Sequence, residues 1–334
     1  MERLLRWTSV IAILFAASSM AVIFYMSAHK VVVIADEAQT SVSSSEQLST
    51  DQQIGIAAKN TETGILYIPI ESEVKATSIA IQSIEVYRGL RIELDGASTE
   101  FYKSQEISGN VDALQNAFYI KYGGKLYIYL SFEDIYECTS HVTGNTLQIT
   151  MARPSEQYDA VVVIDDRTTA GEQAGQVAHA IATKVKEQLS ESGVQVFTIA
   201  TDEVIEDSDV LFLTTHAPAN LYLRLSFAEA EDASILGMSA TYNAAFFMPW
   251  YDNATLADQL LRSTVTAVNG KANGIGDCGE ESLLKQVSIP GCDLCLGYLS
   301  NAQEAKLLQQ DNYQTVIATA IASTITQELA TLQE

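Results

Sequence analysis

Basic residues, histidine and cysteine are scarce in this chain of 334 residues. It carries 19 Lys and Arg against 42 Asp and Glu, which gives a formal net charge of −23. This charge argues against a nucleic-acid partner, because Lys and Arg must neutralise the phosphates. It also argues against contact between the soluble part and an anionic membrane surface. With four His and four Cys, the chain offers few metal ligands or nucleophiles.

Charged residues are absent from a long N-terminal run. After "MERLLR", residues 7–26 carry no charge, and about 20 apolar residues suffice to cross a bilayer. Positive charge before the run predicts that the N-terminus lies inside. We therefore expect residues 1–30 to be a cytoplasmic stub and an uncleaved signal anchor, so that the protein crosses the cell membrane once and its bulk is extracytoplasmic. A cleaved signal peptide is the alternative because of "AASSMA", although "VIFYM" continues the apolar run past it.

Outside the cell, disulfides persist. Cys278 and Cys292 bracket a short segment and are the predicted pair, and the alternative is that both are small buried hydrophobes. The segment "CDLC" has CxxC spacing, but no second CxxC is present to complete a zinc site of four ligands. It also lies in an apolar, strand-like run, where a redox motif is not expected.

The remainder divides by composition into three parts. Residues 31–62 are rich in Ser, Thr, Gln and acidic residues and are predicted to be a flexible linker. Residues 63–152 contain short runs of β-formers such as "KLYIYLSF", with hairpin turns at "YGGK" and "TGNT". They predict a small sandwich-like β domain, a possible wall-targeting module, in which Leu126, Ile128 and Leu130 face the core. The tyrosines of these strands could stack on sugar rings or form ordinary cross-strand pairs.

Residues 160–334 alternate between strand and helix patterns. "VVVID" is a strand, and Val177, Ile181, Val185 and Leu189 form the stripe of a helix. Strands are also predicted at 194–200, 209–217 and 293–299. Helices are predicted at 254–268 and 301–310, and a last helix begins at Asp311. This alternation is typical of an α/β fold of three layers, a mixed sheet with helices on both faces.

Several segments in order carry a family resemblance. "LCLGYLSNAQEAKLLQQDNYQTVIATAIASTI" is similar to the pattern "vEiGFlSNpeDaklL…yq…iA.aIa.gI" of the zinc-dependent N-acetylmuramoyl-L-alanine amidases of bacterial cell walls. "VVVIDD" resembles their "vviDpGHGG", and "DVLFLTTHAPAN" resembles "aDlfiSiHaNa". The resemblance covers residues 161–331 and implies the amidase-like fold.

The resemblance also implies a catalytic site, and most of it is missing here. Relatives hold zinc with two His and one Glu, and a second Glu acts as general base toward a zinc-bound water. The first His position falls on Thr168, and the general base position falls on Cys295. His216 corresponds to the second His. The ligand Glu corresponds to Glu172, or equally well to Ala174.

One imidazole and one uncertain carboxylate do not make a zinc site with an open position. We therefore predict a degenerate amidase that needs no cofactor and does not hydrolyse. It would bind peptidoglycan or wall-associated proteins, or regulate wall hydrolysis. One alternative is an active amidase that uses zinc and cleaves the amide between MurNAc and L-Ala. A purely structural surface protein is the other.

Overall fold

The computed structural model describes residues 52–57, 64–84, 88–168, 170–199 and 205–332. The predicted signal anchor and most of the predicted linker lie outside these residues. Among the helices that are described, none is long and apolar enough to cross a membrane. Part of the predicted linker is packed rather than flexible: Ile54 is buried, and β1 (Gly55–Ile56) pairs in parallel with β5 (Glu106–Gly109).

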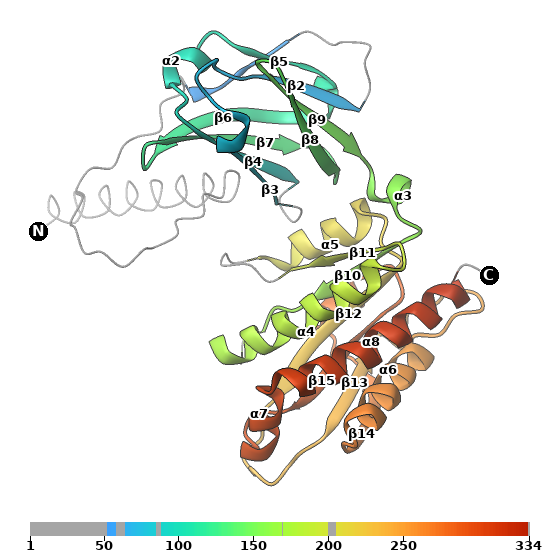
Figure 1. The fold of residues 1–334 in the computed structure, drawn as a ribbon. Coiled ribbons are helices and arrows are strands. Elements are labelled where there is room, and N and C mark those ends of the chain that lie inside the picture. Colours follow the sequence, from blue (N-terminus) through green and yellow to red (C-terminus); the bar gives the residue numbers. More distant parts are fainter. Residues whose placement is uncertain (1–51, 58–63, 85–87, 169, 200–204, 333–334) are drawn as a thin grey trace, which may run out of the picture. The chain divides into compact units, whose positions relative to one another are not determined.

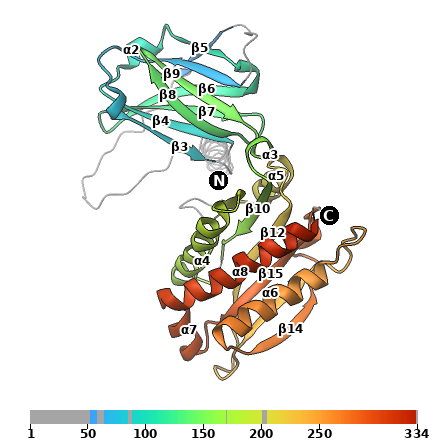
Figure 2. The ribbon, with the colours of Figure 1, turned by 45° about the vertical axis from the view of Figure 1, so that its right-hand side comes forward.

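The region up to Ala152 contains two sheets that share one core (Figure 2). One sheet has the order β1-β5-β2-β9-β8 and the other has the order β3-β4-β7-β6. The remaining elements are β2 (Ile65–Pro69), β3 (Ile79–Ile84), β4 (Gly89–Asp95), α2 (Thr99–Tyr102), β6 (Leu114–Tyr122), β7 (Lys125–Phe132), β8 (Glu137–Thr143) and β9 (Thr146–Ala152).

Alternation along β7 gives this region its core. Leu126, Ile128 and Leu130 are buried, as the sequence predicts. On the opposite side of the strand, Tyr129 stacks on Phe118 of β6 with ring centroids 5.0 Å apart. That tyrosine is therefore used in a cross-strand pair, the second of the two roles considered for it.

The rest of the chain forms a mixed sheet with helices (Figure 1). The strand order is β11-β10-β12-β15-β13-β14. The first four strands are mutually parallel, whereas β13 runs antiparallel to β15. The elements are α3 (Pro154–Gln157), β10 (Ala160–Asp165), α4 (Glu172–Ser190), β11 (Val194–Thr198), α5 (Asp207–His216), β12 (Leu221–Ala228), β13 (Met238–Tyr242), α6 (Asn253–Val268), β14 (Ala272–Asp277), β15 (Gly291–Tyr298), α7 (Ala302–Leu308) and α8 (Asp311–Leu332).

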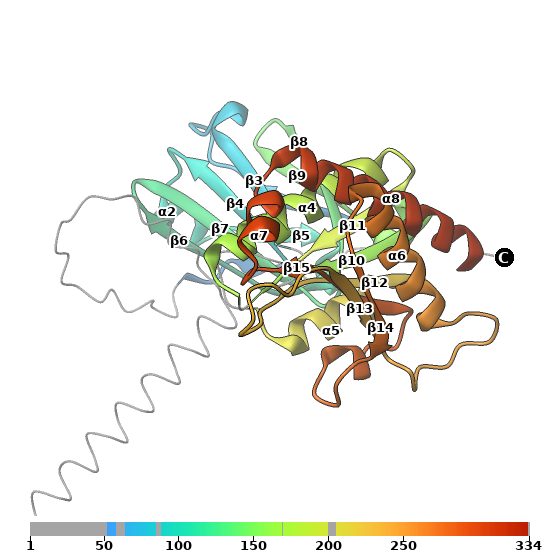
Figure 3. The same cartoon turned by 90° about the horizontal axis from the view of Figure 1, so that it is seen from below.

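Both faces of this sheet are covered, as Figure 3 shows. Helices α4, α6 and α8 pack on one face and bury the predicted stripe of α4 together with Ile317, Ile321, Ile325 and Leu329 of α8. The other face packs against α5 and a short turn of 3₁₀ helix, Leu283–Lys285. Every residue of β10 is buried, which is typical of a parallel strand between two helical layers. The predicted mixed α/β architecture is confirmed.

One predicted strand is wrong. Residues 209–217 were expected to be extended because of the apolar and β-branched run "VLFLTT", but Asp207–His216 is helix α5. Its start is stabilised by the backbone N–H of Glu206, which donates to Asp209 Oδ2 over 3.1 Å, and by acidic side chains near the positive end of the helix dipole. The hydroxyl groups of Thr214 and Thr215 both donate to the carbonyl of Leu211, which satisfies them within the helix.

Candidate functional site at the ends of the parallel strands

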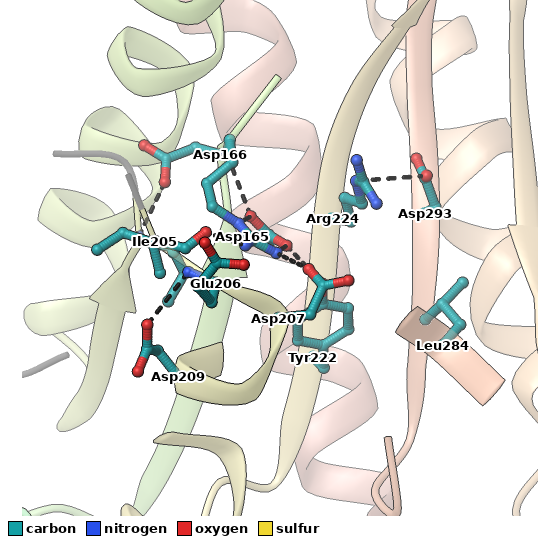
Figure 4. A network of polar contacts seen from close by, with 12 residues as sticks. Asp165, Asp166, Ile205, Glu206, Asp207, Asp209, Tyr222, Arg224, Leu284 and Asp293 are labelled. Atoms are coloured by element: carbon teal, nitrogen blue, oxygen red, sulfur yellow. Dashed lines mark hydrogen bonds and ion pairs between the residues drawn. The ribbon is translucent and has the colours of Figure 1, made fainter. Parts of the chain in front are cut away.

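Asp165 ends β10 and is the centre of a buried polar network (Figure 4). Its side chain is fully buried and accepts hydrogen bonds from Arg167 Nε (2.8 Å), Arg167 Nη2 (2.7 Å) and the hydroxyl of Tyr222 (2.8 Å). Arg167 also donates to the carbonyl of Ile205 and to Asp207. Burial acts to lower the pKa of Arg167, but the hydrogen bonds and charge of Asp165 outweigh it and the pKa is raised. A permanent positive charge is thus fixed beside the end of β10.

Asp166 is also fully buried but points to different partners. Its Oδ1 accepts the backbone N–H of Ile199 (2.9 Å), and its Oδ2 lies 2.8 Å from Nδ1 of His179 on α4. The two neighbouring carboxylates therefore diverge, as expected for adjacent residues of a strand end. They do not form a shared acid–base pair.

The next two strands add a second polar group on the face that packs against α5. Arg224 of β12 and Asp293 of β15 are register partners, and Arg224 Nε lies 3.8 Å from Asp293 Oδ2. The hydroxyl of Ser226 donates to Asp293 Oδ1. Burial raises the pKa of Asp293, while Ser226 and Arg224 act against that rise. This group offers hydrogen bonds and one partly compensated carboxylate.

Cys295 lies beside this polar group and Thr168 follows the end of β10, and each has a local role. Cys295 pairs in register with Ser226, and its Sγ lies 3.7 Å from the carbonyl of Gly297. Burial raises the pKa of its thiol, so the thiolate needed for metal binding or attack is disfavoured. Thr168 follows β10, and its hydroxyl accepts the N–H of Ala170 (3.1 Å). Glu172 is exposed at the start of α4 and accepts a hydrogen bond from Gln176.

His216 does not join these residues. It is the last residue of α5, it is exposed, and its ring stacks on Phe212 at a centroid distance of 3.6 Å. Only a short loop separates it from Leu221, where β12 begins, whereas Ser226 lies five residues further along the strand. At about 3.3 Å per residue, that is roughly 17 Å of strand. His216 therefore lies at the opposite edge of the sheet from Cys295.

The predicted disulfide is also absent. Cys278 and Cys292 are both buried free thiols. Cys292 packs with α4, α6 and α8 on one face of the sheet, whereas Cys278 follows β14 and packs with Leu283 and Leu284 on the other face. The sheet thus separates the two sulfur atoms, and the alternative prediction, two small buried hydrophobes, describes them correctly.

Throughout the described ranges, no three His, Cys, Asp or Glu side chains are grouped so that they could hold a metal ion. At the strand ends the available groups are the hydroxyls of Thr168 and Ser226, the thiol of Cys295, and the carboxylates of Asp165 and Asp293, which are already bound by Arg167 and by Ser226. Neutral hydroxyls are poor zinc ligands. The residues present do not fit a catalytic zinc.

Comparison with known proteins finds a family for part of the chain. Residues 163–327 match the family model of N-acetylmuramoyl-L-alanine amidase. This segment is an N-acetylmuramoyl-L-alanine amidase domain. No curated protein matches the chain.

Three solved structures of N-acetylmuramoyl-L-alanine amidases or related amidases illustrate what this segment is similar to. They are the catalytic domain of CwlV from Bacillus (Paenibacillus) polymyxa var. colistinus (22% identity, 51% of this chain and 98% of that chain, TM-score 0.46), an N-acetylmuramoyl-L-alanine amidase from Clostridium difficile 630 (18%, 51% and 97%, TM-score 0.46), and the CwlD amidase from Clostridioides difficile in complex with the GerS lipoprotein (19%, 52% and 99%, TM-score 0.42).

The sequence alone did not reveal the polar residues that the amidase domain actually brings together. Tyr222, Arg224 and Asp293 lie in strands and carry no motif. Their alternation offered one signal: in "LYLRLS", three leucines face the helices, so the residues between them share the other face. If the strand pattern had been assigned to residues 221–228 rather than to 209–217, this alternation would have identified the polar face of β12.

Proposed function

We propose that this protein is a membrane-anchored, extracytoplasmic amidase-fold protein that does not hydrolyse peptidoglycan and instead binds it or regulates its hydrolysis. The observation that carries the proposal is the chemistry at the strand ends. The guanidinium of Arg167 is held by Asp165 and Asp207, and the next residue, Thr168, supplies only a neutral hydroxyl at the position of the first histidine. A divalent cation at these strand ends would meet the neutral hydroxyls of Thr168 and Ser226, which are poor zinc ligands.

The fold offers another assignment for the second ligand position. If the family pattern "aDlfiSiHaNa" is placed on the strand β12 instead of on α5, it begins at Ala219 and its histidine falls on Ser226. This placement puts the position beside Cys295, in register across β12 and β15. On this assignment no histidine of the zinc site is retained, and the loss of hydrolysis is more complete than the sequence resemblance implied.

Binding or regulation is supported by what has been kept. The sheet, the α4, α6 and α8 layer and the buried network around Asp165 form a complete core, so the domain does not depend on a metal for folding. The uncharged run at residues 7–26 favours a membrane anchor that holds this domain near the wall. A wall-binding or regulatory protein needs this scaffold and no general base.

Three measurements on the full chain, purified in a non-ionic detergent, test the proposal. We expect less than stoichiometric zinc, no release of L-Ala peptides from purified peptidoglycan, and co-sedimentation with insoluble peptidoglycan. Stoichiometric zinc with peptide release would establish the active amidase instead, and loss of that activity in His216→Ala or Glu172→Gln would identify its ligands. Failure to co-sediment would favour a purely structural surface protein.

A gain-of-function experiment tests the ligand positions directly. The variant Thr168→His, Ala174→Glu, Ser226→His should acquire zinc, because it restores two imidazoles and one carboxylate at neighbouring strand and helix ends. The matched control is Thr168→His, Ala174→Glu, which keeps the native His216 and should not. Equal zinc binding by the two variants would show that His216, rather than position 226, completes the set.

A further inference from the structure

An aromatic loop joins β13 to α6 on the edge of the sheet where β15 begins. Tyr242, the last residue of β13, pairs with Cys292 at the start of β15, so the loop lies away from the strand ends that carry Ser226 and Cys295. Phe247 and Trp250 in this loop are 84% and 89% exposed. Large apolar rings are seldom left in water together without a partner. This second edge of the amidase domain is therefore a candidate binding surface.

The loop borders a cavity of about 450 Å³ whose other wall is formed by α6 and α8. Glu328 of α8 lines the cavity although its side chain is almost wholly buried, with a relative exposure of 3%. Its Oε2 accepts a hydrogen bond from the hydroxyl of Tyr251 over 2.7 Å. Burial, and then the bond to Glu328, raise the pKa of Tyr251, so the phenol keeps its proton and remains a donor.

Within the described part of the chain, the hydroxyl of Tyr251 is the donor to the carboxylate of Glu328, and this carboxylate lines the cavity. The lining contains Asp252, Thr255 and Gln259, and none of its described members is Lys or Arg. Both oxygens of Asp252 are already used, since Oδ1 accepts the N–H of Ala254 and Oδ2 accepts the hydroxyl of Thr255. A buried carboxylate with one neutral donor is costly unless a cation or further donors reach it.

These features select the chemistry of the ligand. The faces of aromatic rings, and of Trp above all, attract cations. A buried carboxylate supplies the opposite charge, and the net charge of −23 steers cations toward the protein and repels anions. A neutral sugar would stack on the rings but leave the charge of Glu328 uncompensated. We propose that this cavity binds an organic ammonium group, either a primary amine or a quaternary ammonium, between the aromatic loop and Glu328.

Ligand-observed NMR on the full chain in non-ionic detergent tests the proposal with three probes at constant ionic strength: tetramethylammonium, Nα-acetyl-lysine amide and N-acetylglucosamine. We expect saturable binding of at least one ammonium probe, and the stronger of the two identifies the ammonium type. Glu328→Gln should weaken that binding about tenfold, because the amide still accepts from Tyr251 but carries no charge. Trp250→Ala should weaken it by removing a cation–π contact.

The matched control is Glu280→Gln, which removes the same charge from an exposed side chain elsewhere in the domain. It should bind the probe as the unchanged protein does. Equal weakening by Glu280→Gln and Glu328→Gln would reduce the effect to overall charge and overturn the site. Tighter binding of N-acetylglucosamine than of both ammonium probes, or no binding of any probe, would also overturn the proposal. None of these outcomes depends on whether the domain hydrolyses peptidoglycan.

Discussion

Replacing Asp165 by Asn should destabilise the amidase domain far more than the same change at Asp207. Both carboxylates bind the guanidinium of Arg167, at 2.7 Å and 3.0 Å respectively. The side chain of Asp165 is fully buried, whereas that of Asp207 is 60% exposed. The two variants therefore each remove one carboxylate from the same guanidinium, one in a buried and one in an exposed environment.

The magnitudes follow from that difference. Removing one partner of a buried ion pair costs about 3–5 kcal/mol because the other charge remains buried without compensation. Here Arg167 has a relative side-chain exposure of only 20% and would keep only the exposed Asp207 as a charged partner, and the buried hydroxyl of Tyr222 also loses its charged acceptor. An exposed pair contributes about 0–1 kcal/mol, so Asp207→Asn should lie in that range.

Urea unfolding followed by circular dichroism at 222 nm gives the measurement, because among the described residues the long helices belong to the amidase domain. The free energy of unfolding should fall by about 3–5 kcal/mol in Asp165→Asn. The double variant Asp165→Asn, Arg167→Met should recover part of the loss by removing the stranded charge. If Asp165→Asn and Asp207→Asn lose the same free energy, the network does not stabilise this domain and the reasoning fails.

Three further predictions follow from burial and charge. Ile321→Ala should lower the free energy of unfolding by about 2–5 kcal/mol, because Ile321 of α8 is fully buried. Val316 lies on the same helix but is 41% exposed, so Val316→Ala should change that free energy by less than about 0.5 kcal/mol. Equal urea midpoints for the two variants would contradict this packing. Burial raises the pKa of Asp293 above its ordinary value of 3.8, so the folded state binds a proton at this carboxyl more tightly than the unfolded state does. The free energy of unfolding should therefore fall as the pH rises from about 3.8 through the raised pKa. Asp293→Asn should lack this part of the pH dependence, and the same pH profile in both proteins would refute the prediction. When the unreduced protein is denatured, alkylated and digested, Cys278 and Cys292 should be recovered on separate peptides as alkylated thiols. In the folded protein both should react slowly with the alkylating reagent, because burial raises the pKa of each thiol. A disulfide-linked peptide that contains both would show that the sheet does not separate them.

The sequence predicted the elements whose pattern is set by the local period. Val177, Ile181, Val185 and Leu189 recur at helical spacing, and all four are buried on α4. The strand 293–299 was also predicted correctly, within one or two residues of β15. In these segments local propensity and burial favour the same secondary structure, so the residue pattern alone is sufficient to predict it.

Prediction failed where two local signals competed. The run "VLFLTT" favours a strand by its β-branched and aromatic content, but the preceding acidic residues cap a helix, and packing of Val210 and Leu213 against the sheet decides for α5. On the proposed placement of the family pattern on β12, the same segment is also the reason why the sequence pointed to His216 as a ligand position. The prediction that Cys278 pairs with Cys292 was wrong for another reason. Their short separation along the chain does not determine on which face of the sheet each residue lies, because that depends on the tertiary structure.

The antiparallel course of β13 has a consequence for how such a domain changes over time. It puts the aromatic loop on one rim of the sheet and Thr168, Ser226 and Cys295 on the other, with the hydrophobic layers between them. Substitutions on one rim need not disturb the shape of the other. The two rims can therefore change their side chains independently, on one shared scaffold.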